Sequence, residues 1–325
     1  MRIRHFLFLA VLTGLCSCKE IPTESIEDWT QLSDFPGPGR ASATSFVVGQ
    51  KAYVCLGRTA LKSGFLTDLW VFDSQATSPD SIWIKKTDFP GLPRVKAIAG
   101  VIGTIAYVGM GATGAYDTNK QFNDFWAYDT EHDSWSRKKD FPGVGRNDLF
   151  CAVVNNALYV TMGYSNTRWE YETWKYDPLT NDWIQMPDSP YDASGVAGFS
   201  IGNSFYVGSG FTGYNRKVLY RFQPDNQSWT RMTDLPKGRI LSSSLAIEGK
   251  GYILLGRYWN GAQNGGGLLS DIIEYDPASN AWTGRGHFPG GARQNALAFS
   301  IGEKGYVLMG EDETDRKTDV WVFRP

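Results

Sequence analysis

The chain has 325 residues, of which 42% are apolar and 14% aromatic, and its formal net charge is −2. This length suits one large or two medium domains and allows a sizeable core without disulfide staples. The near-neutral charge, with no basic block, argues against a nucleic-acid partner. The 36 glycines and 12 tryptophans favour an all-β fold with many tight turns.

The first residues have the pattern of an export signal. A short basic start precedes an apolar run from Phe6 to Leu15, which is too short for an ordinary membrane-spanning helix. The run ends in Leu-Cys-Ser-Cys, which resembles a bacterial lipobox with Cys18 as the lipid-bearing residue. We therefore predict a signal peptide over residues 1–17 and a polar tether over 18–27. The protein would be exported and held by its lipid alone, on the periplasmic or cell-surface side of the outer membrane; ordinary secretion is the alternative.

The rest of the chain is built from copies of one pattern, in which Trp is followed by a Phe-Pro or similar turn and then by Arg. The copies begin at Trp29, Trp83, Trp135, Trp183, Trp229 and Trp282. Their arginines are Arg40, Arg94, Arg146, Arg239 and Arg293, with Ser194 in that place in the fourth copy. A fixed period of about 50 residues is typical of propellers.

Two further segments recur in each copy. An alternating apolar stretch leads to Tyr-hydrophobic-x-x-Gly, at Tyr53, Tyr107, Tyr159, Tyr206, Tyr252 and Tyr306. After a variable loop, a third strand opens with an acidic residue, at Asp68, Asp124, Glu172, Asp271 and Asp319, and with Val218 in the fourth copy. Ten of the twelve tryptophans occupy repeat positions, so we expect them to pack blade against blade.

These segments resemble the kelch repeat, and the resemblance runs from Trp29 to the last residue. It implies an all-β, six-bladed β-propeller over residues 28–325, with four-stranded antiparallel blades whose strands run a to d from the channel outward. Trp29–Leu32 would supply strand d of the last blade and close the ring beside Asp319–Phe323. Kelch units carry two glycines after the Tyr strand, but here only the second is kept, as in Gly57. This suggests that only the second position needs a backbone conformation closed to other residues.

The repeated arginines and acids suggest buried ion pairs. The fourth copy lacks both the arginine and the acid. Replacing one partner of a buried ion pair is strongly destabilising, whereas replacing both together leaves no unpaired buried charge. We therefore predict structural pairs rather than ligand-binding arginines. The predicted pairs are Arg40 with Asp68, Arg94 with Asp124, Arg146 with Glu172, Arg239 with Asp271 and Arg293 with Asp319.

The candidate binding residues lie in the variable b–c loops, on the face that also carries the d–a loops. The two tryptophans outside repeat positions, Trp169 and Trp259, both lie there. Their aromatic and polar neighbours are Tyr164, Tyr171, Tyr214, Tyr258, Arg168, Glu170 and Arg216. Such rings suit sugar faces, although packing of the loops onto the blades is the alternative. A second group, expected to line the channel mouth as ligand contacts or as solvated lining, is Lys96, Asn147, Asp148, Gln294 and Asn295.

These patterns favour a non-catalytic module that binds a glycan or a protein. The copper site of the related galactose oxidase is excluded, because the histidines are only His5, His132 and His287, and none forms a pair with ligand spacing. We expect no metal, no cofactor and two unbridged thiols, Cys55 and Cys151. The enzymatic alternative is a sialic-acid mutarotase, a family that shares the six-bladed kelch fold. There, Glu170 with Arg168, or Asp148 with Arg216, would supply the acid–base group and the carboxylate ligand.

Overall fold

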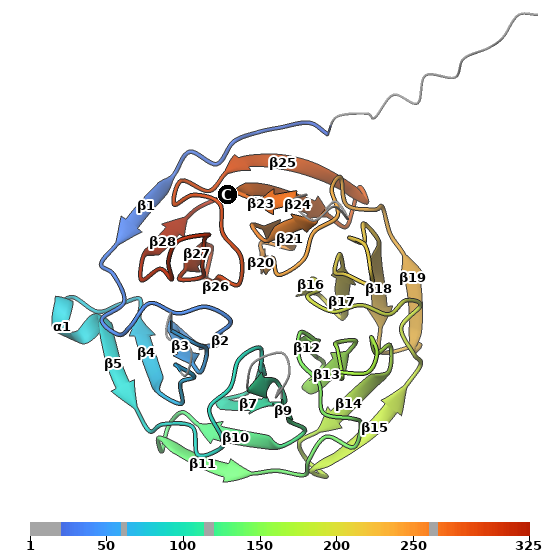
Figure 1. Ribbon diagram of the computed structural model, residues 1–325, viewed down its shortest axis with the longest axis horizontal. Coiled ribbons are helices and arrows are strands. Elements are labelled where there is room, and N and C mark those ends of the chain that lie inside the picture. The colour runs from blue at the N-terminus through green and yellow to red at the C-terminus, as the bar shows by residue number, and fades with distance from the viewer. Residues whose placement is uncertain (1–20, 60–63, 114–119, 260–265) are drawn as a thin grey trace, which may run out of the picture.

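The computed structural model describes residues 21–59, 64–113, 120–259 and 266–325, so the predicted signal peptide and Cys18 lie outside it. Within these ranges, six four-stranded antiparallel sheets surround a central channel, as predicted (Figure 1). A single-turn helix, α1 (Pro79–Ile82), interrupts the all-β fold between the last two strands of blade 1. No helix in the described part of the chain has the length and apolar character needed to cross a bilayer.

The strand bounds, from the channel outward, follow the repeat. Blade 1 contains β2 (Thr44–Val48), β3 (Lys51–Cys55), β4 (Leu69–Asp73) and β5 (Trp83–Lys86). Blade 2 contains β6 (Ile98–Ile102), β7 (Ile105–Gly109), β10 (Phe125–Asp129) and β11 (Ser134–Arg137). Blade 3 contains β12 (Phe150–Val154), β13 (Ala157–Thr161), β14 (Thr173–Asp177) and β15 (Asp182–Met186).

The second half of the ring repeats this order. Blade 4 contains β16 (Ala197–Ile201), β17 (Ser204–Gly208), β18 (Leu219–Gln223) and β19 (Ser228–Arg231). Blade 5 contains β20 (Ser243–Ile247), β21 (Lys250–Leu254), β24 (Asp271–Asp276) and β25 (Ala281–His287). Blade 6 contains β26 (Leu297–Ile301), β27 (Lys304–Leu308), β28 (Val320–Phe323) and β1 (Trp29–Leu32). Two short ribbons in b–c loops pair β8 (Ala112–Thr113) with β9 (Lys120–Gln121) and β22 (Arg257–Trp259) with β23 (Gly266–Leu268).

The ring is closed by strands from opposite ends of the chain, which confirms the predicted closure. β1 pairs antiparallel with β28, with Trp29 opposite Phe323 and Gln31 opposite Trp321 (Figure 1). The Trp29 ring lies 4.5 Å from Phe323 and 5.3 Å from Phe288, centroid to centroid. The edge of β28 is therefore covered, and the apolar cluster between blades 5 and 6 is completed by the N-terminal strand.

Aromatic side chains join each blade to the next. Phe89 follows β5 of blade 1, and its ring packs edge-on against Trp126 and Trp135 of blade 2 at 5.9 and 5.2 Å. The Trp135 indole N–H donates a hydrogen bond to the Thr87 carbonyl across the same boundary, at 2.9 Å. These contacts explain why the repeat keeps both Trp and the Phe-Pro turn, since each such pair adds about 0.5–1.5 kcal/mol beyond area burial.

All five predicted arginine–acid pairs form. Arg40, fully buried, donates to both carboxylate oxygens of Asp68 at 2.7 and 2.8 Å and to the Leu56 carbonyl at 3.2 Å. Burial pushes the pKa of Asp68 upward, but the hydrogen bonds and charge of Arg40 outweigh it and hold the pKa below its usual range. The other four arginines are also buried and paired. They are structural groups, since their donors point into the blades.

Blade 4 requires one correction. The residue in the arginine position is Ala193 and not Ser194, because Gly163 donates its N–H to the Ala193 carbonyl just as Gly111 does to the Arg146 carbonyl. The turn from Ser189 is one residue shorter than in blades 1 to 3, which shifted the sequence assignment. Tyr191, Ala193 and Val218 join one apolar cluster where the other blades hold the ion pair.

The glycine prediction is confirmed, although both positions after the Tyr strand have left-handed backbone. The first position, occupied by Leu, Met or Ser, has φ of 57–65°, and the second, always Gly, has φ of 85–104°. L-residues reach the first range at a cost of about 1–2 kcal/mol, which full burial of side chains such as Leu56 offsets. At the second position, a Cβ on Gly57 would lie 2.9 Å from the Ala43 Cβ and 3.0 Å from the Ala41 carbonyl oxygen.

We expect Gly57→Ala to lower the free energy of unfolding by roughly 3 kcal/mol, because it combines backbone strain with overlap. Gly103→Ala is the matched control, because Gly103 also has a positive φ, 64°, but no atom lies within 4 Å of its added Cβ. It should cost about 1 kcal/mol. Urea unfolding measures both, and equal losses would show that overlap plays no part.

The described part of the predicted tether, residues 21–27, lies against blade 5 instead of standing free. The Gly284 N–H donates to the Pro22 carbonyl at 2.7 Å, and the Glu24 N–H donates to the Gly284 carbonyl at 2.8 Å. Ile26 is buried with Leu245 and Phe288. A Cβ on Gly284 would lie 2.8 Å from the Thr23 Oγ1, so this glycine permits the close approach. Residues 21–27 are therefore part of the fold.

Cys55 and Cys151 are free thiols, as predicted. Cys55 is fully buried, and burial raises its pKa to about 12. Burial likewise raises the pKa of Cys151. Neither thiol is a nucleophile at neutral pH.

Candidate functional site

The channel mouth is ringed by one residue from each blade, two positions after the arginine position. We call this ring the collar; its residues are Ser42, Lys96, Asp148, Gly195, Leu241 and Asn295. All six have left-handed backbone, with φ of 54–63°. Five backbone hydrogen bonds of 2.9–3.2 Å join neighbouring collar residues across blade boundaries. The collar is therefore a nearly continuous ring of backbone, and it fixes the directions of its side chains.

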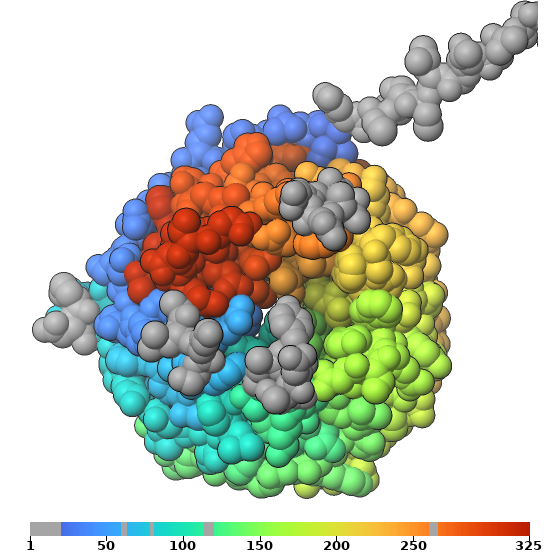
Figure 2. All heavy atoms as spheres, in the orientation of Figure 1, coloured from blue at the N-terminus to red at the C-terminus, as the bar shows by residue number. Residues whose placement is uncertain are grey.

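A cavity of about 190 Å³ lies at the collar, lined by the collar and by the residues that follow it, such as Ala43 and Ser242. Figure 2 shows the mouth as a small opening at the centre of this face. Lys96 and Asp148 form an ion pair across blades 2 and 3, with side chains 26% and 15% exposed. The Ser42 Oγ is buried and finds no hydrogen-bond partner among the residues that the structure describes.

Charged and amide groups on blades 6 and 1 form a polar sector beside the collar, consisting of Arg58, Gln294, Asn295, Glu311 and Arg316. The buried Glu311 carboxylate accepts hydrogen bonds from Asn295 at 2.9 Å and from Gln294 at 3.3 Å. Arg316 lies 3.0 Å from it and Arg58, 42% exposed, lies 3.4 Å from it. Glu311 is thus fixed at the mouth, with Arg58 open to solvent beside it.

Sequence reasoning missed Arg58, Glu311 and Arg316 at this site. The repeat offered a signal for these residues. In each blade, the residue directly after the second glycine forms a β-bridge with the residue directly after the arginine position, as Glu311 does with Gln294. The first residue of every b–c loop therefore adjoins the mouth. The loop behind Glu311 is held by Asp312, whose pKa is kept well below its usual range by hydrogen bonds from Lys317 and from the Thr314 backbone.

An aromatic sector covers blades 3 to 5 on the same face, formed by Tyr164, Trp169, Phe211, Tyr214, Tyr258 and Trp259. Trp169 is partly buried and packs against Tyr164 at 6.0 Å and Phe211 at 6.4 Å, so it holds two loops together. Tyr214 and Trp259 are 57% and 38% exposed. Tyr171, on the same b–c loop of blade 3 as Trp169, is 42% exposed. Tyr171, Tyr214 and Trp259 are therefore the most exposed of these rings, whereas Trp169 is only partly exposed.

The predicted charged neighbours are held by the protein itself. The Arg168 Nε lies 3.1 and 3.0 Å from the carboxylate oxygens of Glu170, which is buried. Burial pushes the pKa of Glu170 upward, but the hydrogen bonds from Arg168 and Ser165 outweigh this and lower it. Arg216 lies over the Tyr214 ring at 4.5 Å and donates to Thr212 and Asp192. Tyr258 carries Lys237 over its ring, at 4.8 Å.

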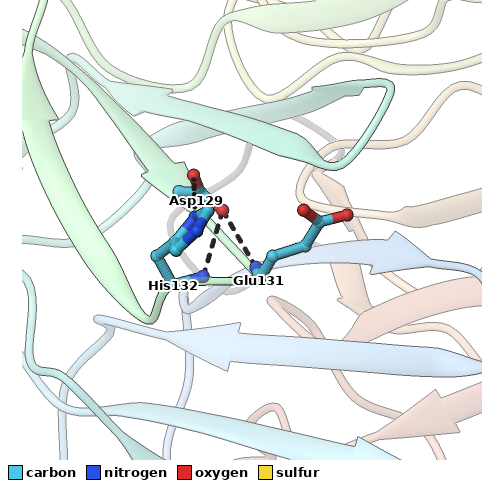
Figure 3. Close-up of side chains that lie close together, drawn as sticks. All are labelled: Asp129, Glu131 and His132. Carbon is cyan, nitrogen blue, oxygen red and sulfur yellow. Dashed lines mark hydrogen bonds and ion pairs between the residues drawn. The ribbon is translucent and has the colours of Figure 1, made fainter.

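On the opposite face, Asp129, Glu131 and His132 come together in the c–d turn of blade 2 (Figure 3). The Asp129 carboxylate accepts hydrogen bonds from the backbone N–H groups of Glu131 and His132, at 2.9 and 3.2 Å, and its second oxygen lies 2.8 Å from the His132 Nδ1. Asp73, Asp177 and Asp276 accept an equivalent backbone hydrogen bond in other blades. The contacts of Asp129 are therefore those of the c–d turn found in other blades, and His132 is one residue of this turn.

Comparisons with known proteins agree with the geometry. The KLHDC2/KLHL20/DRC7 kelch-repeats domain matches residues 42–256. Kelch-like protein 35 of Mus musculus is 23% identical over 61% of this chain and 41% of its own length. The N-acetylneuraminate epimerase of Haemophilus influenzae is 27% identical over 71% of this chain and 57% of its own length. The chain thus spans about half the length of these relatives.

A solved structure, that of YjhT, superposes with a TM-score of 0.78, covering 89% of this chain and 95% of that one. The two sequences are 20% identical, so this likeness concerns the fold.

Proposed function

The chain belongs to the kelch-repeat family, and we propose that its propeller is a non-catalytic binding module that recognises a glycan through the b–c loop face. The observation that carries this is the exposure of Tyr171, Tyr214 and Trp259 on the face that also holds the polar mouth. Aromatic planes stack on the C–H faces of sugars, and the charged groups of the mouth supply strong hydrogen bonds to hydroxyls. A protein partner is the other outcome of the test.

A glycan array with the wild-type protein and Trp259→Ala tests this. The main chain of Trp259 is held by Asn215, which accepts from the Trp259 N–H at 3.3 Å and donates to its carbonyl. Truncation of the ring therefore leaves the loop in place, and affinity should fall roughly tenfold. Leu179→Ala is the control, because Leu179 is 94% exposed in a c–d turn on the opposite face. Absence of any bound glycan, or equal binding by both variants, contradicts the proposal.

A second candidate function is mutarotation of an acidic sugar. It is favoured by the similarity to N-acetylneuraminate epimerases and by Glu311, which is fixed between Arg58 and Arg316 at the mouth. Glu311 would transfer the proton during ring opening, and Arg58 would bind the carboxylate. NMR of freshly dissolved N-acetylneuraminate measures anomer exchange. Acceleration that Glu311→Gln abolishes supports the enzyme, and exchange at the uncatalysed rate excludes it.

We also propose that the protein is exported and anchored through a lipid on Cys18. The lipobox-like sequence supports this. Because Pro22 is hydrogen-bonded to Gly284 of blade 5, an anchor on Cys18 would lie at most about 14 Å along the chain from that blade. Membrane fractionation of the wild type and of Cys18→Ser distinguishes an anchored protein from a freely secreted one.

A further inference from the structure

The collar sets a limit on how a sugar chain can enter the mouth. Five of the six collar residues donate their N–H to the collar residue of the adjoining blade, at 2.9–3.2 Å. The opening cannot widen without breaking these inter-blade hydrogen bonds. Residues from all six blades line the cavity around the channel axis, and the cavity is open to solvent at the mouth.

The chemistry inside this ring differs from that of the loops above it. Asp148 accepts hydrogen bonds, Lys96 donates them, and the side chain of Leu241 offers an apolar surface on the side of blade 5. Ser42 and Ser242 both line the cavity, and the Oγ of each is buried with no hydrogen-bond partner within the described chain. A buried hydroxyl without a partner is costly unless a ligand or water satisfies it.

The cavity is small, at about 190 Å³. This is below the range of about 300–1,000 Å³ that is typical of pockets for drug-sized ligands. It therefore suits one sugar unit, whereas the exposed rings of Tyr214 and Trp259 lie outside it on the loops. An oligosaccharide that contacts both regions must place one unit in the collar and its neighbours over the aromatic sector.

Resting on the proposed glycan-binding function, we propose that the collar binds the terminal unit of the glycan, so that recognition requires a free chain end. A unit in the middle of a chain carries linkages on two sides. Because the six blades surround the cavity about the channel axis, a unit that enters from the mouth has room for one linkage, pointing back toward the loops. Ser42, Lys96, Asp148 and Asn295 then determine which end and which sugar are accepted.

Oriented immobilisation tests this directly. Each oligosaccharide is attached to the array twice, once through its reducing end and once through its non-reducing terminal unit, and cyclic glucans serve as chains without an end. We expect every bound oligosaccharide to give a signal at least about tenfold stronger in one orientation. Equal signals in both orientations, or binding to a cyclic glucan, would overturn end recognition while leaving glycan binding intact. No signal on any probe would refute the proposed function and this inference with it.

Ser42→Ala provides the second test. The Oγ has no partner within the described chain, so its removal should leave the melting temperature unchanged. Loss of one hydrogen bond to the terminal sugar should weaken binding about three- to tenfold in the preferred orientation. Leu179→Ala, on the opposite face, should bind like the wild type. Wild-type affinity in Ser42→Ala would show that the sugar does not reach the collar.

Discussion

Arg94→Ala should lower the free energy of unfolding by about 3–5 kcal/mol, because it leaves the Asp124 carboxylate without its partner inside the blade. Arg94 is fully buried and donates to both oxygens of Asp124 and to the Met110 carbonyl. Burial pushes the pKa of Asp124 upward, but the hydrogen bonds and charge of Arg94, helped by the Trp126 indole and Arg137, hold it below its usual value. Without Arg94, the pKa rises, and the carboxylate either takes up a proton or remains as an uncompensated charge.

Blade 4 supplies the matched control for this variant, because it carries Ala193 and Val218 in the two positions of the pair. The double variant Arg94→Ala/Asp124→Val should therefore be more stable than Arg94→Ala alone, since no unpaired charge remains. Recovery should be incomplete, because blade 4 fills the space with Tyr191, which is buried there. Arg137→Ala removes an exposed pair with Asp140 and should cost at most about 1 kcal/mol.

Urea unfolding of the four proteins measures these differences. A loss within about 1 kcal/mol for Arg94→Ala would contradict the structural role of the arginines. A double variant less stable than Arg94→Ala would contradict the cost that we assign to the unpaired Asp124 carboxylate.

Deletion of residues 21–32 should abolish cooperative unfolding of the propeller. It removes β1, exposes the hydrogen-bonding edge of β28 and takes Trp29 out of the cluster with Phe288 and Phe323. A bare edge strand also promotes association between molecules. Deletion of residues 21–27 alone is the control, because it keeps β1 and removes only the segment along β25; it should lower stability without abolishing the fold.

A synthetic peptide covering residues 21–33 should restore cooperative unfolding of the shortened chain, whereas a scrambled peptide should not. The physical reason is that β1 is held by strand pairing and side-chain packing, so it can complete blade 6 without a covalent link to the rest of the chain. Equal melting curves for the full and shortened chains, followed by circular dichroism, would show that the ring does not depend on β1.

The repeat made most of the fold predictable. Residues at matching positions, such as Arg94 and Asp124, recur with their partners, so their pairing and the loss of both in blade 4 could be inferred from the sequence. Closure by β1 followed because the chain begins with a strand d and ends with a strand c. These predictions need only the alignment of equivalent positions between the repeated units.

Features outside the register could not be predicted in the same way. The segment from Ile21 to Ile26 has no counterpart in the repeat, and its docking depends on the local absence of a side chain at Gly284. The polar sector brings Arg58 and Glu311 together from blades 1 and 6, which are far apart in sequence. The left-handed conformation of Leu56 was missed because burial of its side chain offsets a backbone cost that the residue type alone does not reveal.

The central claim, that the b–c loop face and the collar bind the ligand, is tested most directly by amide hydrogen exchange with and without the oligosaccharide selected on the array. Exchange should slow in residues 164–171, 211–217 and 257–259 and at the collar, and it should stay unchanged in c–d turns such as 129–133. Slowing confined to the c–d turns or to the outer strands, with none at the collar, would place the ligand elsewhere and contradict the claim.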